Sequence, residues 1–515
     1  SNINVKGSTC DVGGLFGIAH YGNQFVNCVC TGNVEIYAAE EAAEAQEIGG
    51  IAGVWHNENG TSVEFANCVF EGALTTNVEG VNFCYGGLVG KAYSETGTGK
   101  LLLNGVEFNK DGVSADFINA ELAAGRGFVM PFDLTFKATA SNGYGVTGLN
   151  QLNGGILDGA GHTLKVTGAN STWGSAINTT GGTIKNITVA GGFRGIFVNH
   201  NGSHSEKVVL ENVTINGPTY TISCDQGMYQ GLEATGCTFN GWTSYAATIG
   251  EVKFTNCSFG KGAGYKFARP YAKTLFEGCN FCEGYEIDAR AEVKFVNCTL
   301  NGVALTAENL ATLVTGNVAN AKIVSTVSTS EELVAALAAG YDVVFANDIT
   351  VAATDGGYHK AGILQNKCQT IDGNGNALTV TGAGATWDCA IYTNGGVIKN
   401  LTVKGAMRGI FTAGTSADLY IENVKFENVI YTFNSDGGNK NYGVYVSNSV
   451  VNGWTSHSNV HKEVVYTNCS FGEGSGYKFC RPYGPTSFVN CTFCPGYTVD
   501  QSQTTEITFT DCIWE

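Results

Sequence analysis

Two aspartates are the acidic residues of this 515-residue chain whose placement suggests catalysis. Asp225 and Asp436 occupy equivalent places in two similar stretches, 211 residues apart (436 − 225 = 211). Hydrolysis of a glycoside needs two carboxylates at a defined separation, and each stretch offers one aspartate. We therefore interpret both aspartates as turn residues, with a catalytic role as the alternative.

Two arginines with apolar neighbours are the next catalytic candidates. Arg194 lies in Phe-Arg-Gly-Ile-Phe, and Arg408 lies in Met-Arg-Gly-Ile-Phe. A guanidinium on a sheet surface can hold the carboxylate of a uronate with two parallel hydrogen bonds. The alternative, which we favour, is an arginine that reaches outward to water or pairs with an acid of a neighbouring strand.

A third constellation combines aromatic rings with arginine and occurs twice. The pattern Tyr-Lys-Phe-x-Arg-Pro-Tyr spans residues 265–271 and 477–483, with a tryptophan upstream of each copy. Aromatic faces beside a fork of hydrogen-bond donors suit carbohydrate rings or a protein partner. A packed loop with arginine stacked on tyrosine is the structural alternative. The candidate ligand-binding residues are Trp242, Tyr265, Arg269, Tyr271, Trp454, Tyr477, Arg481 and Tyr483.

The 18 cysteines suggest disulfides or metal at first sight, because Cys279 and Cys282, like Cys491 and Cys494, have the spacing of metal or redox pairs. Residues three apart on a strand point to opposite faces, however. We therefore interpret the cysteines as small buried residues that stack from coil to coil, with a few disulfides as the alternative. We predict no metal site from these residues and no cofactor, and leave calcium open.

The elements that must position these residues are short strands in repeats. Leu157-Asp158-Gly159 returns as Ile371-Asp372-Gly373, an offset of 214 (372 − 158 = 214), which indicates a tandem duplication. Inside the first copy, Phe254-Thr255-Asn256-Cys257-Ser258-Phe259 has successors that begin at Phe276 and Phe295, after 22 and 19 residues. A period near 20 in residues that favour strands predicts a solenoid whose coils stack about 4.8 Å apart.

The coil motif predicts its own geometry. If Asn256 adopts the left-handed conformation, which asparagine tolerates, the alternation of faces slips by one residue. Phe254, Cys257 and Phe259 then point inward, and the residues between them point outward. Stacked coils place Phe on Phe, Cys on Cys and Asn on Asn, with an internal asparagine ladder.

Two helices are expected at the starts of the solenoid units. One covers residues 115–125, and the other covers residues 330–340 behind a capping Thr329 or Ser330. Such helices shield the open end of a solenoid core. We predict a glycine-rich β-solenoid segment over residues 1–110, a first β-helix unit over 111–316 and its duplicate over 317–515.

These motifs together resemble the pectin-lyase-like β-helix superfamily over roughly residues 113–515, with the closest likeness to surface proteins of gut Bacteroidota. Gly-Gly-aliphatic-x-Gly segments, which recur at Gly13, Gly49 and Gly86, resemble the GLUG repeats of adhesins. The resemblance implies an all-β fold, a right-handed parallel β-helix. Because the superfamily contains lyases and polygalacturonases, the resemblance also implies these activities as alternatives. The chain lacks the Gly-His-Gly segment of polygalacturonases, however.

Charge and the missing catalytic set guide the functional hypotheses. A net charge of −17 argues against a nucleic-acid partner, and no apolar run is long enough for a transmembrane helix. Our leading hypothesis is a non-catalytic, adhesin-like protein of the cell surface or extracellular space that binds a glycan or a host or bacterial surface protein. A phage fibre or tailspike on the virion surface, which would form a homo-oligomer, and an enzyme that cleaves uronate-containing glycans are the alternatives.

Overall fold

The structure is a computed structural model, and its description covers most of the chain. It describes residues 115–125, 127–130 and 133–515, except 200–205, 225–229, 246–249, 356–358, 437–440, 458–460 and 505. Before residue 108 it describes the strands from β1 (Ile3–Lys6) to β14 (Val106–Glu107) with some adjoining residues. Among all the residues that the structure describes, no helix is long and apolar enough to cross a membrane.

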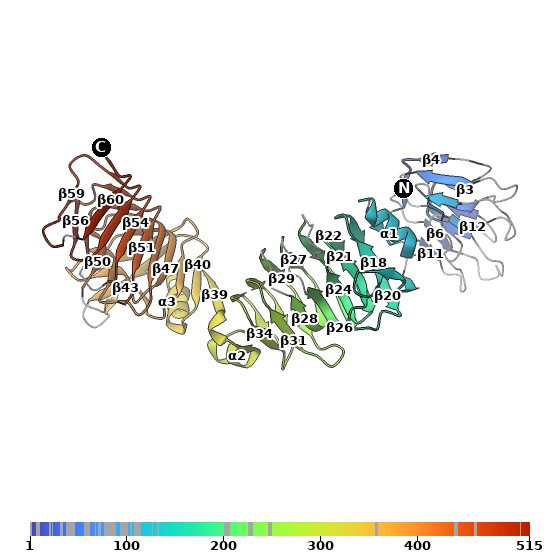
Figure 1. Ribbon diagram of the computed structural model, residues 1–515, viewed down its shortest axis with the longest axis horizontal. Helices are drawn as coiled ribbons and strands as arrows, with labels where there is room; N and C mark the ends of the chain where they lie inside the picture. Colours follow the sequence, from blue (N-terminus) through green and yellow to red (C-terminus); the bar gives the residue numbers. More distant parts are fainter. Residues whose placement is uncertain are drawn as a thin grey trace. The chain divides into compact units, whose positions relative to one another are not determined.

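The chain divides into two compact units, and both are built from short parallel strands stacked coil upon coil (Figure 1). The first unit comprises residues 1–293, 298–304 and 309–321, and the second comprises residues 294–297, 305–308 and 322–515. The predicted class, an all-β parallel solenoid, is therefore confirmed.

The second unit has three ladders of parallel strands. The first ladder contains β40 (Asp342–Phe345), β44 (Thr370–Asp372), β47 (Gly396–Lys404), β49 (Leu419–Glu427), β51 (Val444–Ser447), β54 (Val464–Thr467), β57 (Thr486–Val489) and β60 (Ile507–Thr510). The second contains β41 (Ile349–Ala352), β45 (Ala377–Thr381), the far halves of β47 and β49, β52 (Val450–Asn452), β55 (Ser470–Gly472), β58 (Thr492–Phe493) and β61 (Ile513–Trp514). The third, which we call the site ladder, contains β43 (Lys360–Gln365), β46 (Cys389–Thr393), β48 (Arg408–Thr412), β50 (Tyr431–Ser435), β53 (Trp454–His457), β56 (Phe479–Pro482) and β59 (Thr498–Val499).

The first unit repeats this plan. Its first ladder contains β15 (Phe128–Val129), β19 (Ile156–Asp158), β22 (Gly182–Lys185), β25 (Val208–Glu211), β27 (Leu232–Thr235), β29 (Val252–Thr255) and β32 (Thr274–Glu277). Its second contains β16 (Leu134–Lys137), β20 (Thr163–Thr167), β23 (Thr188–Gly191), β26 (Thr214–Cys224), β28 (Thr238–Tyr245), β30 (Ser258–Gly260), β33 (Asn280–Phe281) and β36 (Thr299–Leu300). Its site ladder contains β18 (Val146–Gln151), β21 (Ser175–Thr179), β24 (Arg194–Val198), β26, β28, β31 (Phe267–Pro270), β34 (Glu286–Ala289) and β38 (Val314–Gly316).

The glycine-rich N-terminal segment also forms parallel ladders. Strands β3 (Phe16–Ala19), β8 (Ala52–Trp55) and β12 (Val89–Ala92) pair in parallel, with Phe16 beside Ala52 and Ala52 beside Val89. These steps of 36 and 37 residues equal the spacing of the Gly-Gly motifs. A Cβ on Gly14 would lie 2.1 Å from the carbonyl oxygen of Gly50, so the backbones approach too closely for a side chain. The third motif, at residues 86–88, lies outside the described residues.

The predicted bend at asparagine is confirmed. Asn256 has a φ of 52°, while Phe254, Cys257 and Phe259 are all buried and Ser258 is exposed. Parallel register sets Phe254 on Phe276 of the next coil, and their rings stack with centroids 5.1 Å apart and an interplanar angle of 11°. The slip in alternation therefore gives every coil the same inward residues.

The asparagine ladder itself lies on the outside of the coils, so the expected internal ladder is wrong. The amide of Asn400 donates to Asp372 Oδ1 at 3.0 Å and its oxygen accepts from Asn423 Nδ2 at 2.9 Å, on partly or fully solvent-exposed surface. The reason is geometric: Phe254 and Cys257 point inward, so both residues between them, Thr255 and the bend residue Asn256, are turned outward.

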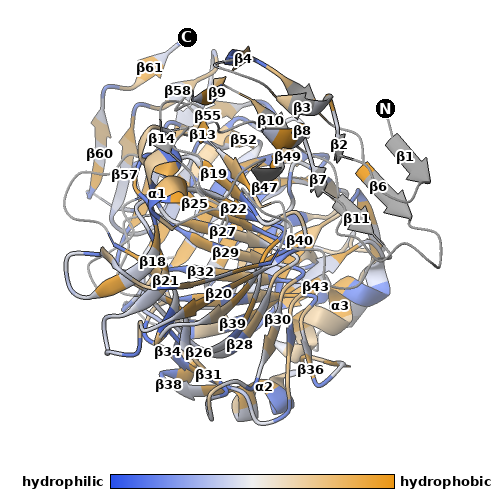
Figure 2. Cartoon of the chain, turned by 90° about the vertical axis from the view of Figure 1, so that its right-hand side faces the viewer, coloured by the Kyte–Doolittle hydropathy of each residue, from blue (hydrophilic) through white to orange (hydrophobic). Residues whose placement is uncertain are grey.

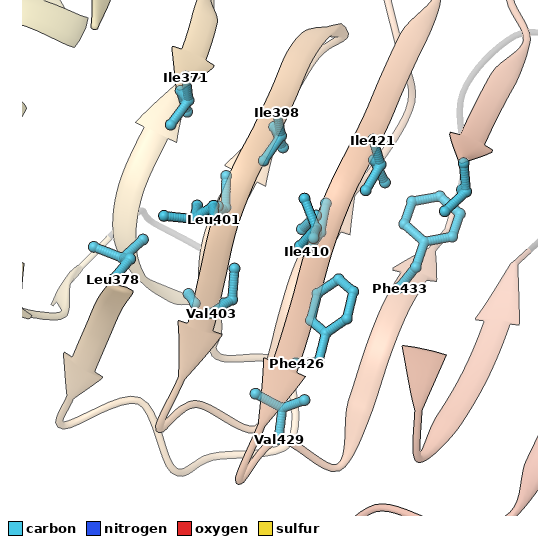
Figure 3. Packing of buried hydrophobic residues seen from close by; sticks show 14 of the residues in the cluster. Ile371, Leu378, Ile398, Leu401, Val403, Ile410, Ile421, Phe426, Val429 and Phe433 are labelled. Atoms are coloured by element: carbon cyan, nitrogen blue, oxygen red, sulfur yellow. The ribbon is translucent and has the colours of Figure 1, made fainter. Parts of the chain in front are cut away.

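Like residues also stack along the core of the second unit (Figure 3). Ile371, Ile398 and Ile421 follow one another in register from β44 to β47 to β49, and all three are buried. Interdigitated aliphatic side chains of this kind supply the main driving force for folding.

Helices begin both predicted solenoid units. Helix α3 (Ser330–Ala339) starts with a capping box between Thr329 and Glu332, ends at Gly340 in the left-handed conformation, and packs against β40 and β43. Helix α1 (Ala115–Ala123) packs against β15 and β18 and is largely hydrophobic in Figure 2. A third helix, α2 (Ala307–Leu313), was not predicted, because its seven residues are too few for a periodic apolar pattern.

The described cysteines form no disulfide, and several of them lie directly after a coil bend. The Sγ atoms of Cys257, Cys279 and Cys298 each donate to a carbonyl oxygen of the preceding coil, at 3.2–3.4 Å. The second unit has Ser449 where the first has Cys237 (449 − 237 = 212), and the hydroxyl of Ser449 accepts from the backbone of Val424 at 3.1 Å. The thiol thus acts as a small buried group with a weak hydrogen bond.

We expect Asn400→Ala to destabilise its coil more than Asn400→Gly. Both substitutions remove the two ladder hydrogen bonds, at roughly 1 kcal/mol in total on exposed surface. Only alanine also pays about 1–2 kcal/mol for the left-handed conformation. Hydrogen exchange of the amides in β47 would measure the free energy of local opening. Equal losses for the two variants would show that backbone conformation at this bend is unimportant.

Candidate functional site

The outer face of the site ladder carries a column of large side chains in register. In the second unit, Arg408 lies beside Tyr431, Tyr431 beside Trp454, and Trp454 beside Phe479. In the first unit the same order is Arg194, Tyr220, Trp242 and Phe267. Because parallel strands stack in register, the column follows the long direction of each ladder.

A second column runs beside the first and ends in the other arginine. It contains Phe411, Asn434, Ser456 and Arg481 in the second unit, and Phe197, Ser223, Ser244 and Arg269 in the first. Small residues in its middle leave room for the large rings of the first column. The two columns therefore place on one site ladder two arginines that are three coils apart and lie 73 (481 − 408) or 75 (269 − 194) residues apart in the sequence.

Arg408 is buried beneath aromatic rings. Its guanidinium carbon lies 4.1 Å from the ring centre of Trp387 and 5.0 Å from those of Phe411 and Tyr431. Its Nε donates to the carbonyl oxygen of Thr386 at 2.9 Å. A cation held between aromatic faces gains from the negative charge of the ring faces.

Arg194 occupies the same environment in the first unit. Its guanidinium carbon lies 4.4 Å from the ring centre of Trp173, and its Nε donates to the carbonyl oxygen of Thr172 at 2.9 Å. One terminal nitrogen, Nη1, also donates to Ser223 Oγ at 2.8 Å. Both arginines are 4% exposed or less, so they do not reach out to water.

Arg481 and Arg269 lie between aromatic rings and a carboxylate. The guanidinium carbon of Arg481 is 5.0 Å from the ring centre of Phe479, and its Nε donates to Asp500 Oδ2 at 3.0 Å. Arg269 does the same with Phe267, at 5.1 Å, and with Asp288, at 2.9 Å. These two arginines are partly exposed, and the carboxylate partners fix their orientation.

The carboxylate of Asp288 accepts from two arginines. Arg290 Nε also donates to its Oδ2, at 2.9 Å. Burial by itself would raise the pKa of Asp288, but the hydrogen bonds from Arg290 and Arg269 outweigh it and hold that pKa below its usual range. The carboxylate is therefore ionised at neutral pH and keeps Arg269 in place.

The exposed aromatic side chains lie at the two ends of each set. The ring of Tyr477 packs against that of Trp454 with centroids 5.3 Å apart and a tilt of 41°, and Tyr265 packs against Trp242 at 5.2 Å with a tilt of 44°. We name each continuous set the aromatic–arginine stripe: Trp173, Arg194, Tyr220, Trp242, Tyr265, Phe267 and Arg269 in the first unit, and Trp387, Arg408, Tyr431, Trp454, Tyr477, Phe479 and Arg481 in the second. Exposed fractions of 37–41% for the terminal tryptophans and tyrosines make these ends accessible to a ligand.

Tyr271 and Tyr483 lie just beyond the strands that carry Arg269 and Arg481. Their side chains are 43% and 38% exposed, so both remain accessible beside the stripes. All eight ligand-binding candidates predicted from the sequence thus lie on or next to a site ladder. Within each unit the four candidates therefore lie near one another, and their role as ligand contacts remains a prediction.

The stripe of the second unit has additional polar neighbours. The ring of His359 lies 4.9 Å from that of Tyr392 and 5.3 Å from that of Phe411. Burial lowers the pKa of His359, the charge of Asp388 opposes this, and the charge of Arg408 adds to it. Asp388 itself accepts from the backbone amides of Lys360 and Ala385 and therefore holds a turn.

The structure describes only one of the two aspartates that the sequence suggests as catalytic candidates. Asp436 follows β50, and its Oδ2 lies 3.9 Å from a terminal nitrogen of Arg408, so arginine and acid come from adjacent coils as the favoured interpretation expects. Asp225 lies outside the described residues. Among the residues that the structure does describe, no three His, Cys, Asp or Glu side chains are grouped so that they could hold a metal ion.

Sequence reasoning missed several members of the stripes. The residues predicted from the sequence do not include Trp173, Trp387, Tyr220, Tyr431, Asp288 or Asp500. The register of a coil repeat was the signal that could have found them, because residues one coil apart must stack. The sequence also does not group Arg194 with Trp242 or Arg408 with Trp454, although the members of each pair lie in one column of the structure.

Comparison of the chain with models of protein families, with curated proteins and with solved structures finds no match. The resemblance to the pectin-lyase-like superfamily therefore remains a prediction beyond the solenoid fold itself.

We expect Arg408→Lys to destabilise the site ladder of the second unit by about 1–2 kcal/mol. Lysine loses the flat face that stacks on Trp387 and the Nε hydrogen bond to Thr386. Hydrogen exchange in β48 would report the local stability. Lys425→Ala is the matched control, because Lys425 pairs with Glu427 on an exposed surface. A loss no larger than that of the control would contradict an energetic role for the buried cation.

Proposed function

We propose that this chain is a non-catalytic, extracellular binding protein that recognises glycans through its aromatic–arginine stripes. The observation that carries the proposal is the presence of the same stripe on both site ladders, with exposed rings at its ends. Aromatic faces pack against the apolar faces of sugar rings, and arginines supply hydrogen bonds to hydroxyl or carboxylate groups. The cell-surface location is supported by the family resemblance and the acidic composition.

The chemistry of the stripe favours binding over catalysis. Arg194 and Arg408 are held under tryptophan rings, and Arg269 and Arg481 are held by carboxylates, so all four are fixed in position. Fixed donors on a rigid sheet lose little entropy when a ligand binds. The carboxylates of Asp288 and Asp500 are committed to arginine, which leaves them poorly suited to transfer protons.

Two stripes on one chain also support the proposal. When one stripe holds a repetitive glycan, the second contact becomes intramolecular, which raises the overall affinity without any new contact. A protein that attaches to a repeating surface gains from such duplication. An enzyme gains less, because one active site already completes its reaction.

A glycan array probed with the intact protein would test the proposal. We expect binding to a subset of glycans, and we expect Trp387→Ala and Tyr477→Ala each to weaken binding to a selected glycan about tenfold, since the loss of one stacked ring costs roughly 1–1.5 kcal/mol. Titration calorimetry on that glycan would measure the change.

Tyr420→Ala is the control for these variants. Tyr420 is 45% exposed and stacks on Tyr445, but it lies on β49, outside the site ladder. It should bind as the unchanged protein does. An array without any bound glycan, or an equal loss in Tyr420→Ala and Trp387→Ala, would overturn the proposed function.

A further inference from the structure

Two histidine side chains are buried in the second unit. His457 ends β53 and is 0% exposed, and His461 is 3% exposed. Both ring nitrogens of each residue lack a hydrogen-bond partner in the described part of the chain. A buried imidazole ordinarily donates or accepts at one nitrogen at least, so this pair is unusual.

Buried aromatic rings pack beside the two histidines. The ring centre of Phe433 lies 6.1 Å from that of His457 and 6.3 Å from that of His461, and Tyr466 lies 6.2 Å from His457. Such surroundings hold a neutral imidazole but cannot solvate a charged one.

Among the described residues, the titratable groups of this core offer the histidines no counter-charge. Burial raises the pKa of Tyr466 on β54, of Cys480 on β56 and of Tyr497, so these three groups are neutral at pH 7. The thiols of Cys469 and Cys491 interact with each other and with Tyr466. The charged groups on the same elements lie outside. Arg481 pairs with Asp500, Asp436 lies near Arg408, and Lys462 and Glu463 follow His461 on the surface, where Glu463 accepts from Tyr445.

We propose that His457 and His461 form an acid-sensitive switch that opens the coils around β53 when the pH falls from neutral to about 5. Protonation of either ring would place an uncompensated charge in the core, which the coil can avoid only by opening to water. Because Trp454 and His457 share β53, this opening would also disrupt the aromatic–arginine stripe of the second unit.

The direction of the effect follows from proton linkage. Burial, reinforced by the neighbouring His461, lowers the pKa of His457 to about 3, and burial lowers the pKa of His461 to about 4. In an opened chain both histidines titrate near 6.5. Between these values the open state binds more protons than the folded state, so stability is present above pH 6.5 and falls as the pH decreases toward 4.

The size of the effect can be stated as a ratio. Between pH 7 and pH 5, protonation of the open state increases the opening equilibrium by roughly 25-fold for one histidine and several hundred-fold for the pair. At pH 5 ordinary carboxylates remain ionised, since they titrate near 4. The two histidines therefore dominate the response in this range.

The first unit supplies an internal control. At the same repeat offset as Trp242 and Trp454, its sequence has Tyr245 in place of His457 (457 − 245 = 212) and Ile249 in place of His461 (461 − 249 = 212). Neither residue titrates between pH 5 and pH 7. The first unit should therefore keep its stability where the second loses it.

Hydrogen exchange with mass spectrometry on the full chain would test the switch, with intrinsic exchange rates corrected for pH. Peptides from β50 to β56 should show an opening equilibrium several hundred-fold larger at pH 5 than at pH 7, while peptides from β26 to β31 should change only a few-fold. The double variant His457→Tyr/His461→Ile, which borrows the residues of the first unit, should lose this pH dependence.

If the double variant does not fold, the two single variants still test the proposal. His457→Tyr and His461→Ile should each leave a dependence of about 25-fold. An equal response of the two units, or a full pH dependence in variants without the histidines, would overturn the proposal.

Discussion

The left-handed bend at asparagine is the constraint on which the rest of this structure depends. At such a bend the alternation of a strand slips by one residue, so an apolar residue before the bend and another directly after it both point inward, as Phe254 and Cys257 do around Asn256. Asparagine and glycine tolerate this conformation, and other residues strain it. Gly236 and Gly278 take the same bend in the coils on either side of Asn256, which shows that backbone conformation is the first requirement and the amide ladder the second.

Parallel register then transmits this regularity through the molecule. Once coils repeat at a nearly constant length, each residue stacks on its counterpart one coil away. Inside, this rule produces stacked phenylalanines and a row of thiols bonded to carbonyl oxygens. Outside, the same rule aligns Arg408, Tyr431 and Trp454, which lie far apart in the sequence. The proposed binding stripe is thus a consequence of solenoid geometry acting on a few large side chains.

The two units use one plan but differ where polar groups enter the core. Tyr466 of the second unit stands where the first has Phe254 (466 − 254 = 212), and Cys480 stands where the first has Ala268 (480 − 268 = 212). Together with His457 these residues make the core of the second unit more polar. Buried polar groups reduce stability unless they are hydrogen-bonded, so their presence calls for a purpose beyond packing.

The sequence by itself determined the solenoid, its coil period, the inward residues of the Phe-x-Asn-Cys-x-Phe motif and both capping helices. These features follow from local rules, because strand alternation, bend conformation and helix capping each involve residues close together in the chain. Only the tertiary structure decided that the asparagine ladder lies outside, that Arg408 is covered by Trp387, and that Arg481 is held by Asp500. Those outcomes depend on which side chains meet between coils, and the contact between side chains from different coils is fixed by three-dimensional register, which no local pattern specifies.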